Sequence, residues 1–357
     1  MMQERRDFIK KVAAFGLAAG VPDFLKAQQI HPPPPNDKIW ACLLHVSYNM
    51  WEDHNQIEKI LPGCDSNMIS RVYDENLRLS EPLWNDALKK MVSDGLNMVV
   101  IDLGDAVKYE THPEIAVKNA WSTSRLKNEL AKIRKMGIEP IPKLNFSTAH
   151  DTWLKEYNKM VSTQKYYEVC SDLIKEVINL FDKPRFFHLG YDEETAEHQK
   201  YYNYVVVRQN DLWWKDFYFF VNEVEKNNVR PWIWSDYVWH HPELFYKKMP
   251  KSVLQSNWYY DDSFDVSETE VKAYLELESH GYDQIPTGGY YESQKGVVNN
   301  DVSMLKTVQF SKKNISDKRL LGFMQTIWRP TLEEHRSRIL KGIDLTGDAR
   351  SWYLKNH

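Results

Sequence analysis

The stretch "TSRLKNELAKIRKMGIEPIPKLNF" (residues 123–146) changes from a helical pattern to an extended one at its glycine. Up to Gly137, apolar residues recur three or four positions apart, which is the spacing of one face of an amphipathic helix. A glycine there is typical of a helix end, and the apolar run over 138–146 predicts a buried strand. Because another apolar run, "LNMVVIDLG" (96–104), precedes the helix, we predict a strand–helix–strand unit.

The same alternation continues along the chain from residue 39. Short apolar runs predict eight strands, at 39–51, 96–104, 138–146, 185–193, 230–238, 252–260, 282–289 and 320–328. Amphipathic segments separate them, such as 267–281, which opens with a Ser-x-x-Glu capping box. Eight such units in about 300 residues predict an α/β fold, a single-domain (β/α)8 TIM barrel. A doubly wound sheet is the weaker alternative, because no glycine-rich turn follows the first run.

The composition of this 357-residue chain limits its function. Hydrophobic residues make up 42%, enough for one large core, and the aromatic set of 13 Trp, 20 Tyr and 14 Phe is large. The net charge of −4 gives no reason to expect a nucleic-acid partner. The three cysteines lack the spacing of a metal site, and no His-Glu-x-x-His motif occurs, so we predict neither a metal nor a cofactor.

The N-terminal segment predicts export. "ERRDFIKK" (4–11) leads into a short apolar run, so residues 1–27 resemble a bacterial twin-arginine signal peptide, and we predict a periplasmic or secreted localisation. The apolar run is too short to span a bilayer, and we predict no stable membrane insertion after cleavage. Residues 28–38 predict a Pro-rich tether and residues 39–357 the folded domain. The alternative for the first segment is a cytosolic amphipathic helix.

Several predicted strands run into polar or aromatic residues at their carboxyl ends, where barrels of this kind hold their active sites. The residues concerned are Asn145, His150, Asp192, Glu193, Trp234, Asp236, Trp258, Tyr290, Glu292 and Trp328. Aromatic rings stack on the C–H faces of a sugar ring, and carboxyl groups transfer protons at a glycosidic oxygen. The sequence therefore predicts a carbohydrate site, with an oligosaccharide or glycan as partner.

The stretch "RFFHLGYDEET" (185–195) carries three acids in a row. Side chains alternate along a strand, so Asp192 shares a face with His188, and Glu193 points to the other face. Both acids can reach one substrate only if the backbone turns near residues 192–193. The alternative is the start of a helix, in which Asp192 is the N-cap and Glu194 is a first-turn acid.

A resemblance becomes specific at "HLGYDE" (188–193). This stretch is similar to the H-x-G-x-D-E signature of glycoside hydrolase family 20, the β-N-acetylhexosaminidases, at the same fourth-strand position. Weaker similarities follow in the family's order, at "IPKLNFSTAHDTW" (141–153), "WIWSD" (232–236), "LQSNW" (254–258), "YYE" (290–292) and "GFMQTIW" (322–328). The resemblance covers roughly residues 39–340 and implies a glycoside hydrolase with a barrel catalytic domain, which the N-terminal segment predicts to be exported.

The resemblance also implies residue roles. Asp192 would hold the N–H of the substrate's 2-acetamido group, whose oxygen attacks the anomeric carbon, and Glu193 would be the general acid and base of a retaining, substrate-assisted reaction. A charged Asp192 and burial are expected to raise the pKa of Glu193, so that it keeps its proton. Three tryptophans would enclose the acetamido methyl group, and a tyrosine would contact the acetamido carbonyl. The full substrate-binding set is His150, Trp234, Asp236, Trp258, Tyr290, Glu292, Trp328, Asn145 and His45.

This chain departs from the family pattern around the sugar hydroxyls. The first strand of the family brings an Asp and an Arg, where this chain has His45 and Tyr48. The third strand brings a Glu and an Asp, where this chain has Lys143 and Asn145. We therefore expect an altered substrate preference. Two alternatives stay open: a glycosidase of the same fold for sugars without an acetamido group, and a glycan-binding protein that lacks catalysis.

Overall fold

The structure, a computed structural model, describes residues 38–63, 66–290 and 300–356. These residues belong to one compact unit, Asn36–His357. The predicted signal segment (1–27), nearly all of the predicted tether, and Glu292 lie outside the described residues.

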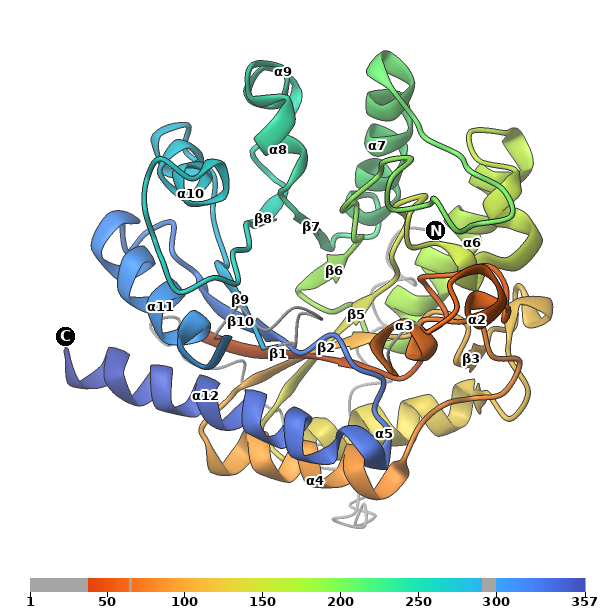
Figure 1. The fold of residues 1–357 in the computed structure, drawn as a ribbon, viewed down its shortest axis with the longest axis horizontal. Coiled ribbons are helices and arrows are strands. Elements are labelled where there is room, and N and C mark those ends of the chain that lie inside the picture. Colours follow the sequence, from red (N-terminus) through yellow and green to blue (C-terminus); the bar gives the residue numbers. More distant parts are fainter. Residues whose placement is uncertain (1–37, 64–65, 291–299, 357) are drawn as a thin grey trace, which may run out of the picture. The chain divides into compact units, whose positions relative to one another are not determined.

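All eight predicted strands are present and pair in one parallel sheet (Figure 1). They are β1 (Ile39–His45), β2 (Met98–Asp102), β5 (Glu139–Lys143), β6 (Phe186–His188), β7 (Arg230–Trp234), β8 (Leu254–Ser256), β9 (Thr287–Gly289) and β10 (Gly322–Thr326). Their order is β8-β7-β6-β5-β2-β1-β10-β9, and the bridges Gln255–Gln284 and Trp258–Thr287 bring the two ends of the sheet together. This ring confirms the predicted (β/α)8 barrel and rules out the doubly wound sheet.

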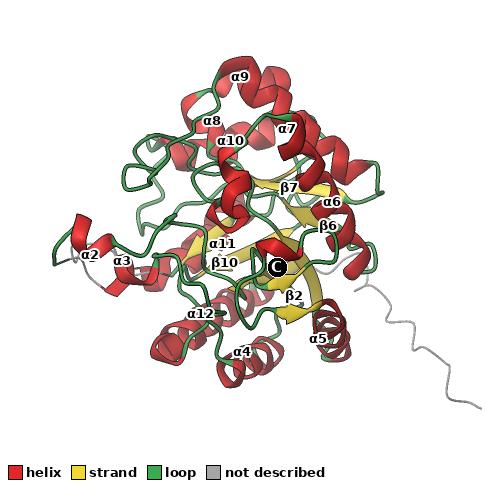
Figure 2. Cartoon of the chain, turned by 90° about the vertical axis from the view of Figure 1, so that its right-hand side faces the viewer, coloured by secondary structure: helices red, strands yellow, loops and turns green. Residues whose placement is uncertain are grey.

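Helices cover the outside of the strands (Figure 2). The longer ones are α4 (Glu81–Ser93), α5 (Thr123–Lys135), α6 (Gln164–Leu180), α7 (Asn210–Glu225), α9 (Pro242–Lys248), α10 (Thr269–Ser279), α11 (Ser303–Asn314) and α12 (Arg336–Lys355). The short elements are α2 (Ile57–Ile60), α3 (Ser66–Ser70), α8 (Tyr237–His240), η2 (Pro113–Ile115), η3 (Thr152–Lys159), η4 (Asn300–Val302), η5 (Glu333–His335), β3 (Val107–Lys108) and β4 (Trp121–Ser122). Among the described helices, none combines the length and apolar character that crossing a bilayer requires.

Local signals account for some helix ends and miss others. The Ser122 hydroxyl accepts the N–H of Arg125 (3.1 Å) and starts α5, and Gly137 beyond its end has the left-handed φ of +81°. The predicted capping box at Ser267 is wrong. Its hydroxyl bonds to the Asp265 carboxylate (2.8 Å) instead, and α10 begins after Glu268 with no side-chain cap.

The core has two layers, as the period-2 pattern of the strands requires. Along β1, Ile39, Ala41 and Leu43 fill the barrel interior, and the residues between them pack under the helices. The aromatic stretch "DLWWKDFYFF" (211–220) lies on α7, and it buries two indoles and two phenyl rings against the barrel. The closed ring fixes the carboxyl ends of all eight strands around one mouth, which is where the site lies.

Candidate active site

A sharp turn follows β6. Residues Gly190, Tyr191 and Glu193 have φ values of +73°, +73° and +55°, in the left-handed region. Tyr191 keeps the outward direction and packs on α7, but Glu193 is turned back into the barrel mouth. The required turn near residues 192–193 is therefore present. The helix-start alternative is wrong, because residues 191–200 contain no helix.

Gly190 is needed for this turn on two counts. Its φ is unfavourable for any side chain, and a Cβ there would lie 1.9 Å from Asn145 Oδ1. We expect Gly190→Ala to cost roughly 1–2 kcal/mol for the backbone and about 1–3 kcal/mol more for the clash, measured by urea unfolding. Gly137→Ala is the matched control, because its φ of +81° is similar but its Cβ would meet nothing within 4 Å. Equal losses for the two variants would contradict the steric argument.

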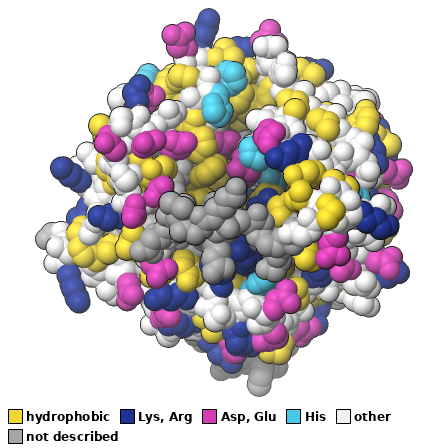
Figure 3. Space-filling view, in the orientation of Figure 1, with side chains coloured by type: hydrophobic (Ala, Val, Ile, Leu, Met, Phe, Trp, Pro, Cys, Tyr) yellow, Lys and Arg dark blue, Asp and Glu magenta, His cyan; other side chains and the backbone are white. Residues whose placement is uncertain are grey.

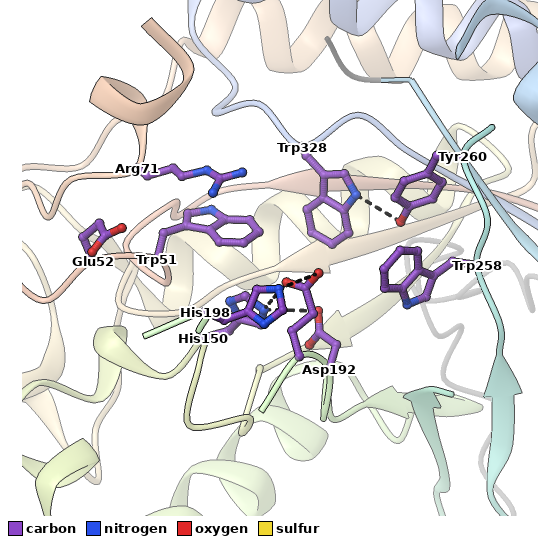
Figure 4. A pocket seen from close by; sticks show the side chains of 10 residues that line it. Trp51, Glu52, Arg71, His150, Asp192, His198, Trp258, Tyr260 and Trp328 are labelled. Carbon is purple, nitrogen blue, oxygen red and sulfur yellow. Dashed lines mark hydrogen bonds and ion pairs between the residues drawn. The ribbon is translucent and has the colours of Figure 1, made fainter. Parts of the chain in front are cut away.

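The mouth of the barrel holds a cavity of about 250 Å³ (Figure 4). Its walls are formed by Trp51, Glu52, Arg71, His150, Asp192, Glu193, His198, Trp258, Tyr260 and Trp328. The Trp258 and Tyr260 rings stack at 5.0 Å, and Trp328 Nε1 donates to the Tyr260 hydroxyl (3.1 Å). These contacts fix the ring planes, so the cavity presents rigid aromatic faces.

Both predicted catalytic acids face this cavity and share one imidazole. Asp192 accepts a hydrogen bond from Asn145 Nδ2 (2.8 Å), and its other oxygen lies 3.5 Å from His150 Nε2. The Glu193 carboxylate lies between two imidazoles, with His150 Nε2 at 3.2 Å from Oε2 and His198 Nε2 at 3.4 Å from Oε1. In the space-filling view, acidic and histidine side chains adjoin near the centre of this face (Figure 3).

The protonation of Glu193 differs from the sequence-based expectation. Burial alone raises the pKa of Glu193, but the hydrogen bonds from His150 and His198, together with the charges of those imidazoles, hold it below its usual range. The expectation of a raised pKa is therefore wrong for this structure. The physical reason is that the hydrogen bonds and charge interactions with the two imidazoles outweigh desolvation. Glu193 rests as a carboxylate, and a proton must reach it before it can act as an acid.

Asp236, which follows β7, has the opposite character. Burial and the charge of Asp192 raise the pKa of Asp236 to about 8. One of its oxygens accepts the backbone N–H of Glu193 (2.9 Å), and the other has no hydrogen-bond partner among the described residues. Asp236 is thus a carboxyl group that keeps its proton to a higher pH than usual, and it holds the turn through its bond to the Glu193 backbone.

The remaining predicted site residues lie around or away from the cavity. Trp234 lies in the barrel interior beside His188 (4.6 Å between rings) and 5.9 Å from the Trp328 ring. His45 lies deeper, 3.5 Å from the Asp102 carboxylate. Tyr290 is directed to the outside, with its ring under the Arg338 guanidinium of α12 (5.1 Å).

Five cavity residues were not in the predicted set: Trp51, Glu52, Arg71, His198 and Tyr260. Trp51 and Tyr260 end two of the apolar runs, and His198 is close in sequence to the acids, so local signals for them exist. Arg71 comes from the long segment between β1 and α4 and has no such signal. Its guanidinium lies 4.6 Å above the Trp51 ring.

The acids could also hold a cation. One ligand atom each from His150, Asp192 and Glu193 lies within 4.8 Å of the others. These are donors that divalent ions accept. That the protein works without a metal stays a prediction.

The fold and the site define a (β/α)8 barrel with two adjacent acids in an aromatic cavity at the carboxyl ends of its strands. Neither the family models nor the curated proteins that were searched matched the chain.

Similar structures have, however, been solved. The chain is similar to a GH20 exo-β-N-acetylglucosaminidase from Vibrio harveyi, with a TM-score of 0.57 and 14% identity over 90% of this chain and 57% of that one. Dispersin B has a TM-score of 0.54 and 16% identity over 76% and 95% of the two chains. A chitobiase from Flavobacterium johnsoniae has a TM-score of 0.55 and 16% identity over 75% and 46%. The chain thus spans less than two thirds of the first and third of these proteins, and at these identities the likeness shows the fold alone.

Proposed function

We propose that this protein is a divergent family 20 glycoside hydrolase that removes β-linked N-acetylhexosamine residues from glycans. The observation that carries the proposal is the turn at residues 190–193, which brings Asp192 and Glu193 into one aromatic cavity. The H-x-G-x-D-E pattern and the shared barrel fold support it. Export of the protein to the periplasm or beyond stays a prediction.

The positions of the two acids favour a nucleophile that belongs to the substrate. In the two-carboxylate schemes the acids flank the glycosidic bond from opposite sides, about 5–5.5 Å apart for retention and roughly 6.5–9.5 Å apart for inversion. Here the acids are sequence neighbours on one wall, with one oxygen of each within 4.8 Å. If one acid protonates the leaving oxygen, the other therefore cannot attack the anomeric carbon from the opposite face of the sugar. The 2-acetamido oxygen of the substrate can reach that face.

The proposed reaction proceeds in two steps. Asp192 accepts the acetamido N–H and aims the acetamido oxygen at the anomeric carbon. As that bond forms, the bond to the leaving oxygen breaks, and Glu193 gives its proton to that oxygen. In the second step Glu193 takes a proton from a water molecule. The water oxygen bonds to the anomeric carbon as the bond between that carbon and the acetamido oxygen breaks, so the configuration is retained overall. Trp258, Trp328 and Tyr260 enclose the sugar and exclude bulk water.

Paired aryl β-glycosides with and without the acetamido group test this proposal. We expect hydrolysis of the N-acetyl compound, at least about 100-fold weaker hydrolysis of the plain hexoside, and inhibition by a thiazoline mimic of the intermediate, because the nucleophile is the acetamido oxygen. Comparable rates on both compounds would favour the glycosidase for plain sugars. Glycan binding without hydrolysis of either compound would favour the non-catalytic alternative.

A further inference from the structure

Glu193 lies between the cavity at the barrel mouth and a second cavity of about 700 Å³. Glu193, His198 and Trp258 line both, and the second cavity continues along α7 and α8 past Trp239 and His240. The carboxylate of Glu193 can therefore exchange protons with groups on either side. Of its two imidazole partners, only His198 borders the second cavity.

His198 is held so that one ring nitrogen faces Glu193. The Thr195 hydroxyl lies 2.8 Å from His198 Nδ1 and accepts the backbone N–H of His198 (3.2 Å). When the Thr195 hydroxyl donates to Nδ1, or when the ring is protonated, Nε2 carries hydrogen and donates to Glu193 Oε1. The imidazole is 42% exposed, so it also reaches solvent.

His150 cannot play the same part. Its side chain is 2% exposed, and its Nε2 is already shared between Asp192 and Glu193. Its Nδ1 is buried without a hydrogen-bond partner in the described part of the chain. The Glu193 side chain is itself 25% exposed, so His198 is not its only contact with solvent, but of its two imidazole partners only His198 can relay a proton between Glu193 and solvent.

We propose that His198 is a positioning residue that stores the proton used by Glu193, an inference that rests on the proposed function. In the resting pair, the imidazolium of His198 faces the carboxylate of Glu193. Transfer of the Nε2 proton to Oε1 turns both into neutral groups and leaves the summed charge unchanged. Glu193 then passes that proton to the leaving oxygen, and the proton it later takes from water returns to His198.

The charges around His198 support this arrangement. The hydrogen bond that His198 donates to Glu193 raises the pKa of His198, desolvation opposes this rise, and the charges of Glu193, Asp192 and Asp236 add to it. His150 faces the same carboxylate from the loop after β5. Glu197 and Lys200 on the turn of His198 pair with each other at the surface. The pair of Glu193 and His198 therefore keeps its shared proton to a higher pH than an isolated imidazole does.

The pH dependence of kcat/KM tests the inference, because it reports groups of the free enzyme. We expect His198→Asn to move the alkaline limb of the kcat/KM profile by at least about one pH unit toward acid, since Glu193 must then hold the proton alone. We also expect added imidazole to restore activity to His198→Ala, because it can enter through the second cavity. His280→Asn is the control: this histidine caps α10 near the start of β9, at the other end of the barrel. A uniform loss of rate with unmoved limbs would overturn the inference.

An NMR titration of the His198 ring makes the test independent of turnover. In the wild type its pKa should exceed the ordinary value, and in Glu193→Gln it should fall, because the carboxylate partner is gone. An identical titration in both proteins would overturn the inference. Absence of hydrolysis by the wild type with a shifted His198 would instead overturn the proposed function and leave the proton-sharing pair in place.

Discussion

Replacing Glu193 by glutamine is expected to lower kcat on an aryl β-N-acetylhexosaminide by roughly 10²–10⁴-fold and to leave KM within a factor of about 3. The amide has the shape of the acid and can still meet His150 or His198, but it has no proton to give. Because a leaving group of low pKa departs without protonation, the loss should shrink for a dinitrophenyl glycoside. Steady-state kinetics on a series of aryl leaving groups measures this dependence.

Glu197→Gln is the matched control for that variant. This carboxylate is 74% exposed and pairs with Lys200 at the surface, so its loss should leave kcat unchanged. Circular dichroism of both variants reports whether the fold is kept. A Glu193→Gln enzyme with wild-type kcat, or a loss that is equal for all leaving groups, would remove Glu193 from the acid role.

Replacing Arg208 by methionine is expected to cost about 3–5 kcal/mol of unfolding free energy. The guanidinium is buried and donates to Glu194 through Nε (2.9 Å) and Nη2 (2.6 Å), and to the Phe146 carbonyl (2.7 Å). Asp216 of α7 lies 3.5 Å from Nη1. Without the cation, two carboxylates remain buried without this partner, and the segment after β6 loses one of its links to the barrel.

Urea unfolding measures this loss, with Lys118→Met as the control. Lys118 pairs with Glu75 at the surface, where both side chains are 63% exposed, and an exposed pair contributes about 0–1 kcal/mol. Adding Glu194→Gln to the Arg208 variant should recover part of the stability, because one unpaired charge disappears. An Arg208→Met protein within about 1 kcal/mol of the wild type would contradict the proposed role of this ion pair.

The same ion pair explains a sequence-based error. Glu194 was expected as a first-turn acid of a helix, because acids after an N-cap residue are common there. In the structure Glu194 is buried against Arg208, fourteen residues further along the chain. A local pattern cannot reveal a partner that approaches from a later loop, so the helical interpretation looked equally good.

The sequence by itself determined the eight strands, several helix ends and the place of two adjacent acids just after β6, because these follow from spacing among near neighbours in the chain. Strand and helix periods are local, and Asp192 and Glu193 are adjacent. The tertiary structure alone decided that Glu193 turns inward, that Arg71 and His198 share its cavity, and that Tyr290 does not. It also reversed the expected direction of the Glu193 pKa. Those properties depend on distances between loops from different strands, and only closure of the barrel sets them.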